Sequence, residues 1–507
     1  MIDQIFIALA AIALVFMLVA IRERRLAQTS LGFFQAGRNI GAVPVSGTYI
    51  ATSLALANAV FYFLWLGYTA GLVGIWIQVA WCLGFVVLFV FAPRILRRSG
   101  HLTFHDFIAS HYGRNVAVFA ATISFLGLSL NFGYEVLIGS TIASETGATG
   151  IAPVLIVAAL VTTLVVIYCV VGGFAAVIRT DMWQWALATA ALLVCFFVLM
   201  TNVVNEIGWR EFVITNPNHF DFFSFQGVAA IGGGVALISN LLFSLPWQVC
   251  DMTSWQKLSA SDERQPNAVR LGILASGVFL IAVPGFLVLM LGILLRNVAG
   301  AEMSLLGAMV AEVALLGGVV TLFVLVGLFA AQVSSADTFL IGASQALVID
   351  LIARNRGGVP MSPYESDKSV PINIDDKYVI IAKRLIPLIA IASVTLVFSL
   401  WYFLLGRDTD GLFNVVYVVY SMQLALAVAV LIALLSRSPI NRPSVGWLSI
   451  GLGVGANLLI LVSSILSVEF VLYGENILSI TAMPTICLIA SVIGATSGFL
   501  ISKKPKQ

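Results

Sequence analysis

The sequence predicts an all-α polytopic membrane protein with about 13 transmembrane helices, including two inverted five-helix repeats in spans 2–6 and 7–11. Composition is the first indication, because 60% of the 507 residues are hydrophobic, only 10% are charged and the mean hydropathy is +1.04. A soluble domain carries about 25% charged residues. The second indication is that apolar runs of helix-spanning length recur along the chain, whereas barrel strands would show only weak alternation.

Thirteen apolar segments can be drawn, and each is expected to cross the membrane once. The first has no basic residue before it and three soon after it, which is the reverse of a cleaved signal peptide. We therefore expect a retained first helix and an N-terminus outside. The segments are 3–21, 44–70, 73–96, 115–142, 150–172, 180–203, 226–250, 269–295, 317–352, 379–404, 411–436, 444–467 and 478–501.

The positions of the basic residues support this count. Of the 26 Lys and Arg residues, only Arg210, Arg296 and Arg407 fall in loops assigned to the outside. One missed or additional helix would invert every later loop and remove the bias. We therefore expect a multi-pass protein of the plasma membrane, such as a bacterial inner membrane, with its C-terminus in the cytoplasm.

We interpret residues 1–507 as a single transmembrane domain. An extra helix (1–21) precedes the first repeat (44–203), and the second repeat (226–436) is followed by two C-terminal helices (444–501). The repeats are inferred from the spacing of two interrupted spans, described below. Between spans, 301–316 is expected to be an external surface helix, and 353–377 an irregular inner loop.

Several classes of function find no support in the composition. A net charge of +2 carries no signal for nucleic acid. The five cysteines lie in or beside apolar runs and are interpreted as buried apolar side chains. The four histidines show no metal spacing, and His101, His105 and His111 are expected to lie solvated in a loop.

The stretch Phe329–Leu340 is polar although it lies inside a long apolar run. On a helix, Ala331, Ser334, Ser335 and Thr338 share one face, because they follow one another at i, i+3, i+4 and i+7. Carbonyl and hydroxyl oxygens of low charge suit Na⁺. The alternative is that the hydroxyls only bond to their own helix, and we favour the ion site.

Two spans are expected to be broken. The second contains the small and hydroxyl residues of 47–58, and the seventh contains Pro246, which removes a helical hydrogen bond. Breaks at corresponding positions of two halves mark binding sites in transporters with inverted repeats. Tight packing of helices through small residues is the alternative reading.

Few charged residues are expected at membrane depth: Glu135, Asp251 and Asp337, with Asp181 near an inner end. Such groups indicate function by default, although a structural hydrogen bond to a neighbouring helix would also explain Glu135. No Lys or Arg is expected at mid-membrane, which disfavours a simple carboxylate as substrate.

Four motifs occur in an order that resembles the sodium:solute symporter family. Residues 168–184 are similar to its Gly-Gly…Ala-Val…Thr-Asp…Gln signature, and 331–340 to its Ser-Thr-Ala-Asp-Ser segment. Residues 34–38 resemble its Ala-Gly-Arg motif, and 255–257 its Gln-Arg motif. The resemblance covers nearly the whole chain and implies the leucine-transporter-like fold and Na⁺-coupled uptake of a small solute.

The resemblance also implies two cation sites. The main Na⁺ site would use carbonyls of Thr52 and Ala55 together with Ala331, Ser334 and Ser335. A second site, present in some members, would use Asp181, Ser334, Asp337 and Thr338. Asp337 stands where some of those members have serine, so the aspartate pair could bind a proton instead.

A substrate pocket is expected beside the two breaks, although packing in the core or against lipid is the alternative for any single aromatic residue. The amides and carboxylates among its candidate residues favour a neutral, zwitterionic or amine-bearing solute, such as an amino acid, a sugar or a urea-like compound. The candidates are Asn58, Phe61, Tyr62, Asn131, Tyr134, Glu135, Asn240, Trp247, Gln248, Asp251 and Gln423.

The sequence thus predicts a non-enzymatic secondary transporter that works as a monomer in a lipid bilayer and couples its solute to Na⁺ by alternating access. A channel would show charge rings or a filter sequence, and neither is visible. A membrane enzyme would need a histidine or metal ligands at depth. A proton-coupled symporter of the same fold is the main alternative, and a non-transporting solute sensor is a weaker one.

Overall fold

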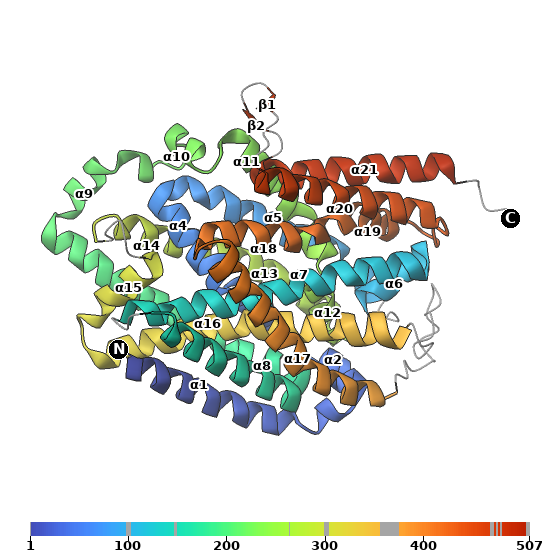
Figure 1. Cartoon of the computed structure of the whole chain (residues 1–507), viewed down its shortest axis with the longest axis horizontal. Helices are drawn as coiled ribbons and strands as arrows, with labels where there is room; N and C mark the ends of the chain where they lie inside the picture. The colour runs from blue at the N-terminus through green and yellow to red at the C-terminus, as the bar shows by residue number, and fades with distance from the viewer. Residues whose placement is uncertain are drawn as a thin grey trace.

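The computed structural model describes residues 2–97, 103–146, 150–262, 264–298, 304–354, 375–466, 471–472, 475–476 and 479–502, and these are almost entirely helical (Figure 1). The strands in these ranges are β1 (Val471–Leu472) and β2 (Glu475–Asn476), which pair antiparallel. The α-helices are α1 (Ile2–Glu23), α2 (Ser30–Gln35), α3 (Ala42–Ser53), α4 (Tyr62–Thr69), α5 (Ile75–Arg97), α6 (Phe104–Tyr112), α7 (Arg114–Thr141), α8 (Ala152–Glu206), α9 (Trp209–Thr215), α10 (Phe225–Ala230), α11 (Gly233–Cys250), α12 (Met252–Ala260), α13 (Pro266–Leu280), α14 (Leu289–Leu295), α15 (Leu305–Ala314), α16 (Gly318–Gln345), α17 (Lys377–Ser399), α18 (Thr409–Ser421), α19 (Leu426–Leu435), α20 (Pro443–Ile465) and α21 (Met483–Ile501). Short π-helical turns, η3 (Leu56–Phe61), η7 (Ile281–Val288), η8 (Ala346–Ala353) and η9 (Leu400–Leu404), continue several of them.

The predicted all-helical membrane fold is confirmed. Among the described residues, eleven helices are long and apolar enough to cross a membrane, or twelve if the bent pair α3 and η3–α4 counts as one span. Each of the thirteen predicted segments falls on helix, and two of them share α8. The stretch 305–314 is the helix α15, within the predicted 301–316.

Helix α8 is too long for one span. A straight helix of its 55 residues would measure about 80 Å, roughly twice the thickness of a bilayer with its headgroups. Its backbone turns at Gly173, where φ is 59° and ψ is −160°. A side chain there would lie within 3.1 Å of Phe33 backbone atoms, which explains the glycine. Two spans within α8 would bring the count to thirteen, which stays a prediction.

The long helices lie side by side along the horizontal of Figure 1. Helix α1 begins on the left and α21 ends on the right, as an odd number of crossings requires. The end of α16 and the start of α17 lie toward the right, and α1 runs rightward below them and ends nearer the middle. The sequence assigns all three ends to the same side. That this side is the cytoplasm stays a prediction.

Helix α16 forms the centre of the bundle. Every residue from Gly327 to Ala346 is buried, and the helix packs against α1, α3, α7, α8 and α17. A helix that is covered all round occupies a core. The polar stretch of α16 therefore contacts protein rather than lipid, where its hydroxyl groups can find partners.

The second span is broken as predicted. Helix α3 ends at Ser53, Ala55 has a non-helical ψ of 139°, and helix resumes at Leu56 after a bend of 57°. The seventh span breaks elsewhere than predicted, because Pro246 lies inside α11. Its break is at Asp251, whose ψ is 122° and whose side chain accepts hydrogen bonds from Thr253 and Ser254. An Asp in this role starts a new helix.

Two predictions about polar residues are wrong. His105 and His111 lie buried on α6 rather than in a solvated loop, whereas His101 is outside the described residues. Lys257, assigned to an inner loop, is 2% exposed within α12. Both errors arose because short helices fold back into the bundle, which an apolar-run analysis does not detect. The five cysteines are buried and free, as predicted, and most of the predicted inner loop lies outside the described residues.

Candidate cation and solute site

The hydroxyl groups of α16 meet the end of α3. Ser334 Oγ donates to the Ala331 carbonyl at 3.0 Å and to the Ala51 carbonyl at 3.1 Å. Ser335 Oγ donates to the carbonyls of Ala331 at 3.3 Å and Gln332 at 3.1 Å. Both serines are fully buried. The serines therefore do bond to their own helix, which was the alternative to an ion site. Ser334 also bonds to the broken span and so joins α16 to α3.

The contact to the break lies one residue earlier than predicted. The predicted ligand Ala55 uses its carbonyl to accept from Ala59 and Val60, at 3.0 Å each. The Ala51 carbonyl faces Ser334, and Leu54 follows three residues later, outside the helix. Among the described residues, no backbone N–H donates to the Leu54 carbonyl. The turn from Ala51 to Leu54 thus offers carbonyl oxygens at the position where Thr52 and Ala55 were expected.

Ser334, Asp337 and Thr338 of the second predicted site lie on one stretch of α16. The Thr338 hydroxyl lies 3.2 Å from Thr52 Oγ1 and donates to Asp337 Oδ1 at 3.3 Å. The hydroxyl of Thr48 donates to Asp181 Oδ2. In the described part of the chain, Asp181 Oδ1 and Asp337 Oδ2 are buried without a hydrogen-bond partner. Buried carboxylate oxygens are normally paired, so a bound cation or proton fits both.

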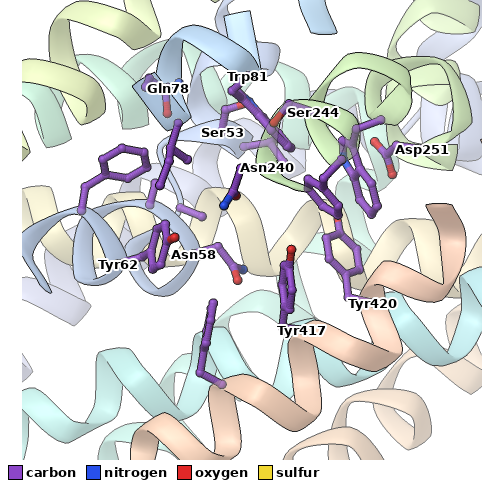
Figure 2. A pocket seen from close by; sticks show the side chains of 18 of the residues that line it. Ser53, Asn58, Tyr62, Gln78, Trp81, Asn240, Ser244, Asp251, Tyr417 and Tyr420 are labelled. Atoms are coloured by element: carbon purple, nitrogen blue, oxygen red, sulfur yellow. The ribbon is translucent and has the colours of Figure 1, made fainter. Parts of the chain in front are cut away.

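A cavity of about 410 Å³ lies beside the two breaks (Figure 2). Its lining includes Thr52 and Ala55 and seven of the eleven predicted substrate residues, namely Asn58, Phe61, Tyr62, Asn240, Trp247, Gln248 and Asp251.

The other four predicted substrate residues lie behind the cavity. Asn58 Nδ2 donates to Asn131 Oδ1 and Glu135 Oε1, both at 3.0 Å. The ring of Tyr134 is 6.2 Å from that of Phe413. Gln423 is buried, and its amide has no hydrogen-bond partner among the described residues.

The sequence reasoning missed several lining residues. Three aromatics of α18 could have been found, because Phe413, Tyr417 and Tyr420 follow one another at i, i+4 and i+7 and so share a helix face. The others were not singled out, although Ser53 and Ser244 lie within the broken spans themselves. They include Ser53, Gln78, Trp81, Phe243, Ser244, Lys257 and Asn414.

Aromatic rings form two walls of the cavity. In the first wall, Phe413 stacks on Tyr62 and Tyr417, with 5.6 Å between ring centroids and interplanar angles of 15° and 16°. In the second, Phe243 stacks on Trp81 at 6.1 Å and on Trp247 at 4.6 Å. The walls meet where Phe243 lies 5.7 Å from Tyr417. The cavity is therefore largely apolar, with a few polar groups, as is usual for small-molecule sites.

The sequence pattern of the Sodium:solute symporter family matches residues 33–357. The chain belongs to the sodium:solute symporter family. The four motifs had indicated this, and Na⁺ is accordingly the coupled ion. The matched residues run from α2 to just beyond α16, and so include both broken spans and the serines. No curated protein sequence matches the chain.

Solved structures share the fold of this symporter. A Na⁺-coupled sialic acid symporter in a substrate-bound outward-open state is 16% identical, with a TM-score of 0.72 and 99% of each chain covered. MhsT in complex with L-phenylalanine is 15% identical, with a TM-score of 0.52 over 91% of this chain and 99% of that one. A manganese transporter from Eremococcus coleocola is 14% identical, with a TM-score of 0.52 over 93% and 100%. At such identities the likeness concerns the fold alone.

Proposed function

We propose that this symporter carries a small polar organic solute across the plasma membrane together with Na⁺, by alternating access. The observation that carries the proposal is the Ser334 hydroxyl, which joins α16 to the end of the broken α3 beside the cavity. An ion held at that junction would couple the position of the broken span to the centre of the bundle.

The main Na⁺ site is assigned to carbonyls of Ala51, Leu54 and Ala331 and to the hydroxyls of Ser334 and Ser335. This assignment moves the two carbonyls of the break one residue back from Thr52 and Ala55. Every ligand in the set is an uncharged oxygen, so binding is moderate and the ion can leave. The membrane potential contributes about 2.3 kcal/mol per charge per 100 mV to inward movement.

A second cation is assigned to Asp181, Ser334, Asp337 and Thr338. The two carboxylate oxygens without partners support occupancy by Na⁺ or by a proton. Proton coupling is therefore the second candidate function. It would make uptake follow a pH gradient in the absence of Na⁺, whereas Na⁺ coupling would not.

Thermal unfolding of the purified protein tests the main site. Sodium should raise the Tm relative to potassium at equal ionic strength, because the ion binds only the folded protein. The double variant Ser334→Ala/Ser335→Ala should lose most of this rise and bind ²²Na⁺ about tenfold more weakly, a change of about 1.4 kcal/mol.

Ser344→Ala is the matched control. Ser344 lies on the same helix, is equally buried and has no hydrogen-bond partner among the described residues. This variant should respond to Na⁺ like the unmodified protein. An unaltered Na⁺ response in the double variant would contradict the assigned site. A Tm that depends on pH but not on Na⁺ would favour the proton.

A further inference from the structure

We infer that the solute of this site is uncharged and carries a planar ring. The inference rests on the proposed transport function and narrows its substrate class. It depends on which polar groups of the cavity are still available to a ligand, and on the shape that the aromatic rings leave for it.

The first broken helix has its amide end occupied by the protein itself. Ala57 N donates to Glu135 Oε2 at 3.1 Å, and Asn58 N donates to Glu135 Oε1 at 3.3 Å. The side chain of Asn58 adds a third bond to Oε1. Glu135 accepts in every one of these bonds. It takes the backbone donors that the break at Leu54–Ala55 released.

The second broken helix shows the same arrangement. Asp251 lies in the break, and its carboxylate accepts from Thr253 N at 3.2 Å and Ser254 N at 2.9 Å. The hydroxyls of Thr253 and Ser254 bond to the same carboxylate, at 2.5 and 3.0 Å. Both helix starts beside the cavity are therefore capped by carboxylates of the protein, and both carboxylates are in use.

This arrangement removes the usual partner of an anionic solute. In transporters with broken helices, the free amide ends of half-helices bind anionic groups of the substrate. Here Glu135 and Asp251 occupy those ends. The cation that borders the cavity, Lys257, is 2% exposed, lies 5.2 Å over the ring of Tyr49 and is flanked by Asp251 and Asp181. Lys257 is therefore almost inaccessible to a solute.

A cationic solute lacks a partner for the same reason. Glu135 accepts three hydrogen bonds from backbone and amide N–H groups, and Asp251 accepts four from backbone N–H groups and hydroxyls, so an amine would compete with these donors to form an ion pair. The polar groups left over are neutral. Figure 2 shows the side chains of Asn58 and Asn240 and the hydroxyl of Tyr417 reaching toward the middle of the cavity from different sides.

The aromatic walls determine which shape of solute fits the cavity. The rings of Tyr62, Phe413 and Tyr417 are nearly parallel, and Phe413 stacks on both of the others, so the three rings form one continuous stack. Flat rings pack best against other flat rings in offset stacks, which are worth about 0.5–1.5 kcal/mol beyond the area they bury. A planar ring would stack along a wall, while amide groups of Asn58 and Asn240 bond to neutral donors and acceptors on its edge.

The test uses probes that share a ring and differ in charge. Nicotinamide is neutral, nicotinate is anionic and 1-methylnicotinamide is cationic, and uracil with orotate forms a second neutral and anionic pair. In saturating Na⁺, nicotinamide or uracil should raise the Tm of the full-length protein at millimolar concentration. Its charged counterparts should bind at least tenfold more weakly.

The inference is overturned if a charged probe protects as well as its neutral counterpart, or if neither neutral ring protects. Sodium alone is measured in the same series. A normal rise of Tm with Na⁺ and no preference for neutral rings would reject the substrate class and leave the proposed coupling intact. Loss of the Na⁺ response would instead reject the coupling.

A gain of binding provides an independent check. Glu135→Ala frees the amides of Ala57 and Asn58, so nicotinate should now protect this variant in Na⁺. Glu135→Gln keeps an acceptor in place and should not bind nicotinate. If Glu135→Ala is too unstable to purify, the ligand series on the unmodified protein still tests whether the site prefers an uncharged ring. If it folds and gains no nicotinate binding, the cap is not what excludes anions.

Discussion

At the scale of single residues, the largest departure from the sequence analysis is a buried ionic cluster in and beside η8, which continues α16 at its C-terminal end. The carboxylate of Asp350 accepts from Thr103 at 2.5 Å and from Arg354 at 3.0 Å, and it bonds to His105 at 2.7 Å. Arg354 also pairs with Asp106 at 2.5 Å. All of these side chains are buried, so the cluster ties α6 to the end of the helix that carries the serines.

Replacement of Asp350 should therefore be strongly destabilising. Asp350→Asn leaves Arg354 buried with one carboxylate fewer, and breaking a buried ion pair costs about 3–5 kcal/mol. We expect a Tm that is lower by several degrees in detergent, with the Na⁺-induced rise retained. Asp375→Asn is the control, because Asp375 pairs with Lys377 at the surface. Equal Tm values for the two variants would contradict a structural role for the cluster.

At the scale of elements, the second half of the first broken span, α4, is held by a close helix crossing. A side chain at Gly67 of α4 would come within 2.1 Å of the Leu289 carbonyl, and one at Gly292 of α14 within 2.2 Å of the Leu64 carbonyl. Small residues allow such close approach of helix backbones in membranes. This helix crossing fixes α4, which follows the break, while α16 contacts α3, which precedes it.

Gly292→Ala should accordingly separate α4 from α14. Because the clash is with backbone, we expect a loss of about 1–3 kcal/mol, as for overpacked cores, together with weaker Na⁺ protection. Thermal unfolding with and without Na⁺ measures both effects. Gly455→Ala on α20 meets no atom within 4 Å and should be neutral or slightly stabilising. A Gly292→Ala protein as stable as the Gly455→Ala protein would show that the crossing adapts.

The break in the seventh span shows what sequence patterns miss. Proline indicated an interruption, but Pro246 lies within α11 and the chain breaks five residues later. A proline costs one hydrogen bond and need not end a helix, whereas Asp251 ends one helix because it caps the next. At the first break, Ser334 contacts the carbonyl of Ala51, one residue before the predicted ligand Thr52, since no local pattern tells which carbonyl will face α16. That choice depends on tertiary packing.

At the scale of the whole molecule, sequence alone predicted the class well. Hydropathy and the distribution of Arg and Lys indicated the spans, and the polar stretch of α16 indicated the central helix. The solute cavity was predicted only in part. Residues with unusual chemistry for a membrane, such as Asn58 and Asn240, stood out, whereas Trp81 and Phe413 did not, because apolar aromatics are common in every span.

The predicted orientation can be tested directly. The five native cysteines are buried, so a new surface cysteine can be labelled against a low background. A membrane-impermeant maleimide should label Arg210→Cys in intact cells and label Arg437→Cys only after permeabilisation. Both positions are exposed. The reverse pattern would invert the topology, and labelling of both in intact cells would contradict the predicted crossings between them.

The capped helix starts also matter when nothing is being carried. Backbone N–H groups in a dry interior need a partner at every moment. If the solute were that partner, the N–H donors would have no partner whenever the transporter returned without solute. Here the partners are Glu135 and Asp251, which belong to the protein itself. An unloaded carrier can therefore reset with these amide groups still bonded.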